Sequence, residues 1–240
     1  MYREVVIMDY IIFKGIDSRT IKGLMICKLP PITKARKRVQ ETTIDGLDGS
    51  IIEELGYETY DKEIEIGLKG NFNIDEIINY FNGEGNIVFS SEPDKYYKVS
   101  IIDQINYEKL IRFRKAVVKL RTQPFKYLYG ETYQKFDNSP AGKTLIVTNE
   151  GLEKSKPIIT LKGSGTIAFM LENSTIFTYT FPSNETDVII DSEKQDAYVG
   201  SILKNRNMVG EFPIFKSGKN NITVTGNVTE ITVIANSRWL

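Results

Sequence analysis

GKNNITVTGNVTEITVIANSRWL, residues 218–240, sets the expected fold of the second half of the chain. Apolar and polar residues alternate over 221–225 and over 229–235, which is the period of a half-buried strand. Gly226-Asn227 lies between the two runs and suits positive φ, so the sequence predicts a hairpin there. On the last strand Ile231, Val233 and Ala235 share one face, as expected for the final hairpin of a β-sandwich.

The chain upstream of this stretch has the same character as far back as residue 143. Turns rich in Gly, Asn, Asp and Ser separate short strand patterns, which is typical of a sandwich or jelly roll. The predicted strands are 144–149, 157–162, 166–171, 175–181, 186–190, 197–199 and 211–215. The polar segment 131–142, with Pro140 and Gly142, is expected to be a linker between this domain and an N-terminal domain over 1–130.

The N-terminal domain is also predicted to be mainly β, with one short α-helix. Strands are expected over 4–13, 85–91, 96–108 and 110–127, and over 61–70, where Ile64, Ile66 and Leu68 share one face. Residues 73–82 break this pattern because Ile74, Ile77, Ile78 and Phe81 form one apolar helical stripe. Asn73 and Glu76 have the spacing of a capping box, and Asn82-Gly83 ends the predicted helix.

The composition excludes many kinds of function. Lys plus Arg and Asp plus Glu both number 31, so no net charge favours nucleic acid. Histidine is absent and Cys27 is the single cysteine, which removes zinc sites, Cys–His nucleophiles and internal disulfides. No apolar run approaches the length of a membrane span, and the N-terminus is a poor signal peptide, so synthesis in the cytoplasm is expected.

Two motifs suggest enzymatic chemistry, but each has a structural interpretation that the residues favour. GSGTIA, residues 163–168, fits the loose dinucleotide fingerprint, yet strand-forming residues follow it instead of a helix, so a turn between strands is expected. The carboxylates at Glu53, Glu54, Glu58, Asp61, Glu63 and Glu65 resemble the solvated face of strands more than a glycosidase pair. We therefore expect no catalytic, cofactor or metal site.

A basic cluster lies at Lys34, Arg36, Lys37 and Arg38. No stacking aromatics interleave it, so a dedicated single-stranded nucleic-acid site is not expected. The sequence favours a solvated hairpin arm or a polar interface. A basic arm facing the lumen of a ring is a further hypothesis.

Several stretches, in this order, resemble the distal tail proteins of long-tailed phages that infect Gram-positive bacteria. FKGIDSRTIKGLMICKLPPI (13–32), TTIDGLDGSIIEELGYETYDKEIEI (42–66), TNEGLEKSKPIITLKGSGTIAFMLEN (148–173) and the closing stretch are similar to segments of that family. NYFNGEGNIVFSSEPDKYYKVSIID (79–103) and VVKLRTQPFKY (117–127) carry its signature residues. These are Asn82, Gly83, Gly85, Tyr96, Tyr97, Pro124 and Phe125.

The resemblance implies a structural, non-enzymatic protein of the virion, made in the host cytoplasm and placed at the distal end of the tail. It implies a hexameric ring formed by the N-terminal domain, with a C-terminal galectin-like β-sandwich. The implied partners are other copies of the chain, the tail tube protein, and tail-tip, tail-fibre or baseplate proteins. Two alternatives stay open: a module that binds cell-wall sugar through aromatics such as Tyr179 or Tyr198, and a carboxylate-based glycan hydrolase.

Trp239, the single tryptophan, lies at the last position but one. We expect it to be at least half buried, against the C-terminal sandwich or the interdomain seam, and to pin the chain terminus as a closing peg.

Overall fold

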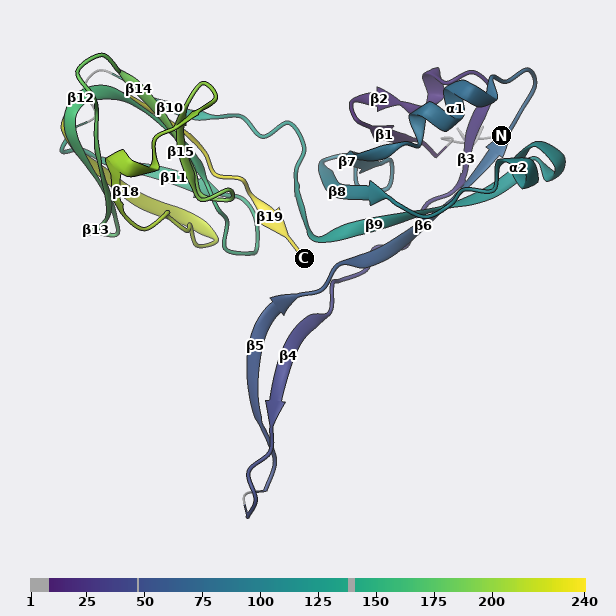
Figure 1. Cartoon of the computed structure of the whole chain (residues 1–240), viewed down its shortest axis with the longest axis horizontal. Helices are drawn as coiled ribbons and strands as arrows, with labels where there is room; N and C mark the ends of the chain where they lie inside the picture. Colours follow the sequence, from purple (N-terminus) through teal and green to yellow (C-terminus); the bar gives the residue numbers. More distant parts are fainter. Residues whose placement is uncertain (1–8, 47, 138–140) are drawn as a thin grey trace, which may run out of the picture. The chain divides into compact units, whose positions relative to one another are not determined.

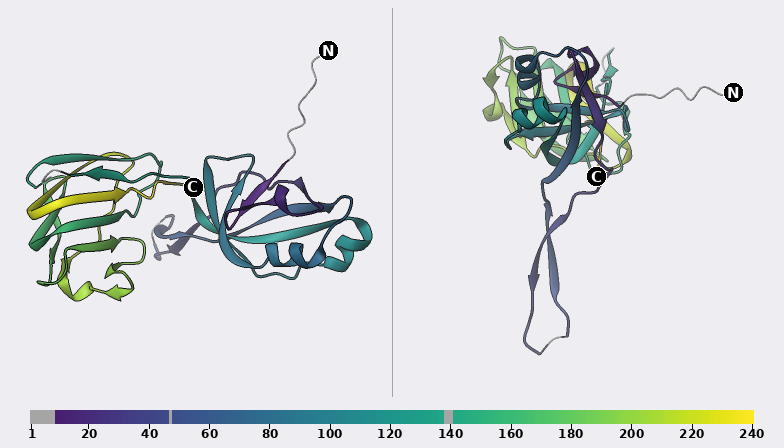
Figure 2. Two further views of the ribbon diagram at one scale, coloured as in Figure 1. Left: turned by 90° about the horizontal axis from the view of Figure 1, so that it is seen from above. Right: turned by 90° about the vertical axis from the view of Figure 1, so that its right-hand side faces the viewer.

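The structure, a computed structural model, describes residues 9–46, 48–137 and 141–240. Contacts divide the chain into two compact units, one ending at Tyr129 and including Leu240, the other spanning Gly130–Trp239. Both units are built mainly of β-strands, as the sequence predicts (Figures 1 and 2).

Unit 1 is formed by one antiparallel sheet with the strand order β2-β1-β7-β8-β9-β6-β3. Its elements are β1 (Ile11–Phe13), β2 (Ile16–Asp17), η1 (Ser18–Thr20), β3 (Leu24–Lys28), β6 (Tyr60–Leu68), α1 (Ile74–Tyr80), β7 (Gly83–Phe89), β8 (Lys95–Ile101), α2 (Tyr107–Phe113) and β9 (Lys115–Leu128). Two further strands, β4 (Lys37–Thr42) and β5 (Ile51–Tyr57), pair with each other and form a separate two-stranded sheet.

The core of unit 1 follows the alternation of the sequence. Ile64, Ile66 and Leu68 on β6 are buried, as predicted from their spacing. The predicted strand 4–13 appears as β1 from Ile11, and its residues 4–8 lie outside the described residues.

The predicted helix is confirmed as α1. The Asn73 side chain accepts hydrogen bonds from the backbone N–H groups of Asp75 (3.1 Å) and Glu76 (3.5 Å), so Asn73 is the N-cap. Ile77 is fully buried, whereas Ile78 is 40% exposed. The buried face of the helix therefore includes Ile77 and Tyr80, and Ile78, which the sequence pattern placed on that face, lies partly outside it.

A second helix, α2, corrects the sequence prediction of one helix and two long strands over 96–108 and 110–127. The strands end at Ile101 and begin again at Lys115, and α2 lies between them. The Asn106 side chain caps its start by accepting a hydrogen bond from the Lys109 N–H (2.7 Å), and Leu110 within the helix is fully buried. Arg114, in the left-handed conformation (φ 61°), ends it.

Unit 2 consists of one curled sheet whose strands form two layers. Its elements are β10 (Gln134–Phe136), β11 (Thr144–Asn149), β12 (Ile158–Leu171), β13 (Ser174–Thr180), β14 (Asp187–Asp191), β15 (Asp196–Val199), β16 (Ile202–Leu203), η2 (Asn205–Asn207), β17 (Met208–Gly210) and β18 (Gly218–Ile234). The short strand β19 (Arg238–Trp239) follows β18 and is not a strand of this sheet. The first part of β12 pairs with β14 and the second part with β13. The first part of β18 pairs with β11 and the second part with β10. The two long strands pair with each other along their length and so belong to both layers (Figure 1).

This arrangement corrects the predicted hairpin at Gly226-Asn227. Residues 218–234 form one continuous strand, and GSGTIA likewise lies inside β12 and not in a turn. The β12–β18 register shifts between Lys162 and Gly163 and between Ser164 and Ala168, opposite Gly226. A Cβ at Gly226 would lie 2.4 Å from the Thr166 carbonyl oxygen, and one at Gly163 would lie 2.2 Å from the Asn227 carbonyl oxygen. Glycine at both positions therefore lets the two strands cross closely where they pass between layers.

The segment 131–142, predicted to be a linker, contributes a strand to unit 2. Gln134, Lys135 and Phe136 form β10 and pair with Val233, Thr232 and Ile231 of β18. The polar composition of this segment reflects the position of β10 at the edge of the sheet.

Candidate assembly surfaces

The two-stranded sheet β4–β5, here called the arm, is the most exposed part of unit 1 (Figure 1). Every described residue of its two strands except Tyr57 is exposed. Among the described residues of β4, β5 and the turn between them, the exposed large apolar side chains are Val39, Ile44, Ile51, Ile52 and Leu55, with exposed fractions of 47–62%. A two-stranded hairpin alone is only marginally stable in water, so these side chains are suited to contact another surface.

The root of the arm is fixed to the sheet at several points. The Glu58 N–H donates to the Arg36 carbonyl (2.8 Å). This bond continues the pairing of β4 and β5 into the segments that join the arm to the sheet. The rings of Tyr57 and Phe125 make an edge-to-face contact with centroids 5.5 Å apart. The Lys62 ammonium donates to the Pro31 carbonyl (2.8 Å), on the segment that leads from β3 into the arm.

The predicted basic residues Lys34, Arg36, Lys37 and Arg38 are all exposed at the base of the arm. Two of them interact within the arm, because Lys37 pairs with Glu54 (2.5 Å) and Arg38 donates to the Leu55 carbonyl (2.9 Å). Residues 33–58 contain four basic and six acidic side chains, a net charge of −2. The arm as a whole is therefore not basic, and the lumen role of these residues stays a hypothesis.

The signature residues near α1 support the β1–β2 turn. The Lys14 ammonium donates to the Asn82 carbonyl. Gly83 has positive φ (77°), and a Cβ at Gly85 would lie 2.7 Å from Cγ of Lys14. Asn82, Gly83 and Gly85 therefore shape the backbone around the Lys14 side chain, which is a role in packing.

The tyrosine pair lies on opposite faces of β8. Tyr96 stacks on Tyr127 with centroids 5.3 Å apart, whereas Tyr97 is buried against Phe89. The Tyr97 hydroxyl donates to the Glu92 carboxylate, which also accepts from the Lys126 ammonium (2.6 Å). On β9, Phe125, which follows Pro124, provides the ring that holds Tyr57.

A buried charged cluster therefore lies behind the arm root, and the sequence prediction did not include it. Burial alone would raise the pKa of Glu92, but hydrogen bonds from Lys126 and Tyr97 outweigh it and hold that pKa below its usual value. Burial lowers the pKa of Lys62 to about 8, despite the nearby Glu92 carboxylate. Burial and the hydrogen bond to Glu92 raise the pKa of the Tyr97 hydroxyl. Lys62 also lines a pocket of about 370 Å³ together with Pro31 and Asp61. The contacts of the cluster hold the root of the arm in place.

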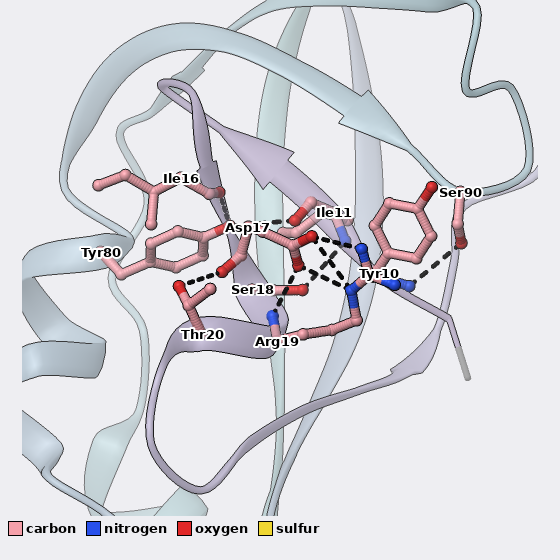
Figure 3. A network of polar contacts seen from close by, with 9 residues as sticks. All are labelled: Tyr10, Ile11, Ile16, Asp17, Ser18, Arg19, Thr20, Tyr80 and Ser90. Carbon is pink, nitrogen blue, oxygen red and sulfur yellow. Dashed lines mark hydrogen bonds and ion pairs between the residues drawn. The ribbon is translucent and has the colours of Figure 1, made fainter. Parts of the chain in front are cut away.

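A second polar network fastens the start of β1 to α1 (Figure 3). The Arg19 guanidinium binds the Asp17 carboxylate and lies over the Tyr10 ring, 3.9 Å from its centroid. This pairing with Arg19 holds the pKa of Asp17 below its usual value. The Tyr80 hydroxyl donates to the Ile16 carbonyl (3.1 Å), and the Ser18 hydroxyl accepts from the backbone N–H of Ile11 (3.1 Å).

Three of the carboxylates considered for catalysis line one pocket of about 370 Å³, but each of them is paired with a basic side chain. Asp61, Glu63 and Glu65 lie on the exposed face of β6 and pair with Arg121, Lys119 and Lys115 of β9, respectively. Glu53 and Glu54 lie on the exposed β5 strand of the arm. Within residues 9–46, 48–137 and 141–240, no group of three or more His, Cys, Asp or Glu side chains is arranged to hold a metal ion.

The last residues of the chain are bound to unit 2 through their backbone. The Glu131 carboxylate accepts hydrogen bonds from both the N–H and the hydroxyl of Ser237, and the Arg238 carbonyl accepts from the Glu153 N–H (3.2 Å). A Cβ at Gly151 would lie 2.3 Å from the Arg238 carbonyl oxygen, so the segment packs closely here. Trp239 is partly exposed, and its role as a terminal peg stays a prediction.

Among the described residues no helix is long and apolar enough to cross a membrane. No family model and no curated protein sequence matches the chain.

Solved structures with a similar fold include phage hub and baseplate proteins. The chain resembles the Dit protein (gp 19.1) of phage SPP1, described as a paradigm of the hub adsorption apparatus in phages that infect Gram-positive bacteria. Identity is 15%, the TM-score is 0.67, and the match covers 97% of this chain and 99% of Dit. It also resembles a chain of the phage p2 baseplate in its activated conformation with Sr, at 9% identity, a TM-score of 0.54 and coverage of 94% and 96%. The corresponding structure with Ca gives 8% identity, a TM-score of 0.52 and coverage of 95% and 97%. The chain therefore has the fold of phage hub and baseplate proteins, in agreement with its resemblance to distal tail proteins.

Proposed function

We propose that this chain is the distal tail hub protein of a phage, a structural component that joins the tail tube to tail-tip or baseplate proteins. The observation that carries the proposal is the fold match over the full length of a phage hub protein, 97% of one chain and 99% of the other. Both units of the chain are included in that match. A likeness limited to one β-sandwich would fit many unrelated functions.

In this proposal six copies form a closed ring through unit 1. A ring requires heterologous contacts, in which one surface of each copy binds a different surface of the next. The arm supplies a surface of the required kind, because its described residues expose five large apolar side chains and it carries little packing of its own. The zero net charge of the chain leaves such contacts unopposed by long-range repulsion.

Binding of cell-wall sugar by the aromatics of unit 2 receives no support from the structure. Tyr179, one of the two residues considered for a sugar groove, is fully buried, with its ring against Phe181. Tyr198 is partly exposed and lies beneath the Lys194 ammonium.

The arm is tested by comparing two lysine substitutions at exposed apolar positions. Ile52→Lys changes the arm, and Val209→Lys changes unit 2 at a residue that is 72% exposed. Neither should alter the fold of the free chain, since both side chains already face solvent. We expect Ile52→Lys to abolish ring formation in sedimentation and light scattering, while Val209→Lys assembles as the parent does. Equal assembly of the two variants would contradict a role of the arm in the ring.

A further inference from the structure

Helix α2 exposes two basic side chains beside an exposed aromatic ring. A hollow of about 220 Å³ lies on this side of the helix, lined by Asn106, Glu108, Lys109, Arg112 and Phe113. We call the last three of these residues the α2 patch. Phe113 is 62% exposed, and the Arg112 guanidinium lies 5.4 Å from the centroid of its ring. In the described part of the chain neither Lys109 nor Arg112 forms an ion pair, so the patch is basic as well as apolar.

One face of the arm has the opposite composition. The register of β4 with β5 places Val39 opposite Glu54 and Glu41 opposite Ile52. Directly opposite residues of an antiparallel pair share a face, so apolar and acidic side chains alternate on this one. Val39 is 48% exposed and Ile52 is 62% exposed. We call these four residues the acidic face of the arm.

The charge of this face is only partly compensated within the arm. Glu54 pairs with Lys37. Glu41 accepts a hydrogen bond from the Ser50 hydroxyl, and no basic side chain among the described residues pairs with it. The acidic face and the α2 patch therefore match each other, because each places exposed apolar side chains beside charge of opposite sign.

The two surfaces lie at opposite ends of the β6–β9 pair. The arm leads into β6 at Tyr60, whereas α2 precedes Lys115 of β9, which lies opposite Gly67 of β6. Seven strand residues separate these ends by about 23 Å. Figure 1 shows the same separation within unit 1. A contact between the acidic face and the α2 patch therefore joins two copies, and because the surfaces differ, each copy can contact the next in the same way around a ring.

We propose that the acidic face of the arm of one copy docks on the α2 patch of the next copy. Ile52 packs against Phe113, and Glu41 pairs with Arg112 at the rim of the contact. The inference rests on the proposed function, since it names the surface that the arm contacts in the ring. Complementary rim charges fix which surfaces meet, while the apolar contact at the centre supplies most of the affinity.

Charge exchange in the full-length chain tests the pairing. Glu41→Arg and Arg112→Glu are made singly and together, and ring assembly is followed by sedimentation velocity. Each single change brings like charges together and should raise the concentration needed for assembly at least about tenfold. The double variant restores opposite charges and should assemble within about threefold of the parent. Arg206→Glu, at an exposed arginine of η2 in unit 2, is the matched control and should assemble as the parent does.

Thermal unfolding of each variant before assembly checks that the fold is kept. Equal assembly of Arg112→Glu and Arg206→Glu would overturn the inference and leave the hub function standing. A double variant that assembles no better than the single ones would also overturn it. A parent chain that forms no ring, alone or with its tail partners, would contradict the proposed function itself, and the inference would fall with it.

Disulfide cross-linking locates the apolar contact independently of charge. In a Cys27→Ser background, Ile52→Cys is combined with Phe113→Cys, and as a control with Ile16→Cys, which changes another exposed residue of unit 1 (48%). Disulfides form only where the two Cα atoms come within about 7 Å. The first pair should give a ladder of cross-linked chains in non-reducing gels, and the control pair should not. Equal ladders from both pairs, or cross-linking by Ile52→Cys alone, would assign the arm to a different surface and overturn the inference.

Discussion

The arm and the β12–β18 pair are both long antiparallel strand pairs that contain glycine. They differ in whether their apolar side chains are covered by other strands. In unit 2 the strands bend at Gly163 and Gly226, so that one pair of strands contributes to two layers and encloses its own core. In the arm β4 and β5 pair only with each other, and apolar side chains remain exposed. Unit 2 therefore derives its stability from its own packing, whereas the arm carries apolar surface that the rest of unit 1 leaves uncovered.

The largest expected effect is at the bend of unit 2. Gly226→Ala places a Cβ against the Thr166 carbonyl oxygen and adds strain at a φ of 96°, so the strands must separate. We expect a loss of more than about 4 kcal/mol in the free energy of unfolding. Urea denaturation followed by circular dichroism measures it.

Gly218→Ala is the matched control on the same strand. Gly218 also has positive φ (80°), but a Cβ there would meet nothing within 4 Å. Backbone strain alone should cost about 1–2 kcal/mol. Equal losses for the two variants would show that close crossing at Gly226 is not what shapes the unit.

A smaller effect on the free energy of unfolding is expected when one isoleucine of unit 2 and one of the arm are each replaced by alanine. Ile231 is fully buried in the core of unit 2, and Ile52 is 62% exposed on the arm. Ile231→Ala should lower the free energy of unfolding by about 2–5 kcal/mol, and Ile52→Ala should change that of the free chain by no more than about 0.5 kcal/mol. A large loss for Ile52→Ala in the unassembled chain would mean that the arm is already covered within one copy.

We expect the free energy of unfolding to depend on pH through Lys62, which lies at the root of the arm. Its folded pKa of about 8 lies below the ordinary value of 10.5, so the folded state disfavours the charged form. This penalty is fully present below pH 8 and disappears as the pH rises from 8 to 10.5. The chain should therefore gain stability over this interval relative to Lys62→Met, on the order of 2 kcal/mol. Parallel stability curves for the two proteins from pH 7 to 10.5 would refute the assignment.

The smallest expected effect concerns the ion pair within the arm. Lys37 and Glu54 pair across β4 and β5, but both side chains are exposed. A double-mutant cycle with alanine at both positions should give a coupling energy below about 1 kcal/mol. A larger value would indicate that the arm stabilises itself and would weaken the contrast with unit 2.

Local patterns in the sequence were sufficient for the elements whose burial follows their own periodicity. The spacing of Ile64, Ile66 and Leu68 predicted the buried face of β6, and the Asn73 cap predicted the start of α1. The alternation in LIRFRK also resembled a strand, although this segment ends α2. The buried position of Leu110 and the Asn106 cap decide the helix, and the first of these is a tertiary contact.

Long-range pairing accounts for the other errors. Gly226-Asn227 has the local chemistry of a hairpin turn, but the partner of this region is Gly163-Ser164 on β12, more than sixty residues earlier. The basic residues of the arm and Glu54 were both noted in the sequence, but the pairing of Lys37 with Glu54 was not predicted. Its contact with Lys37 depends on a register that a bulge between Arg38 and Val39 displaces.

The central claim, a tail hub built from rings of this chain, is tested most directly by electron microscopy of the purified protein, alone and together with its tail tube and tail-tip partners. The account predicts ring-shaped particles with six-fold symmetry in class averages, and loss of these rings when the arm carries Ile52→Lys. Particles that remain single copies, or rings without six-fold symmetry, in the presence of those partners would contradict it.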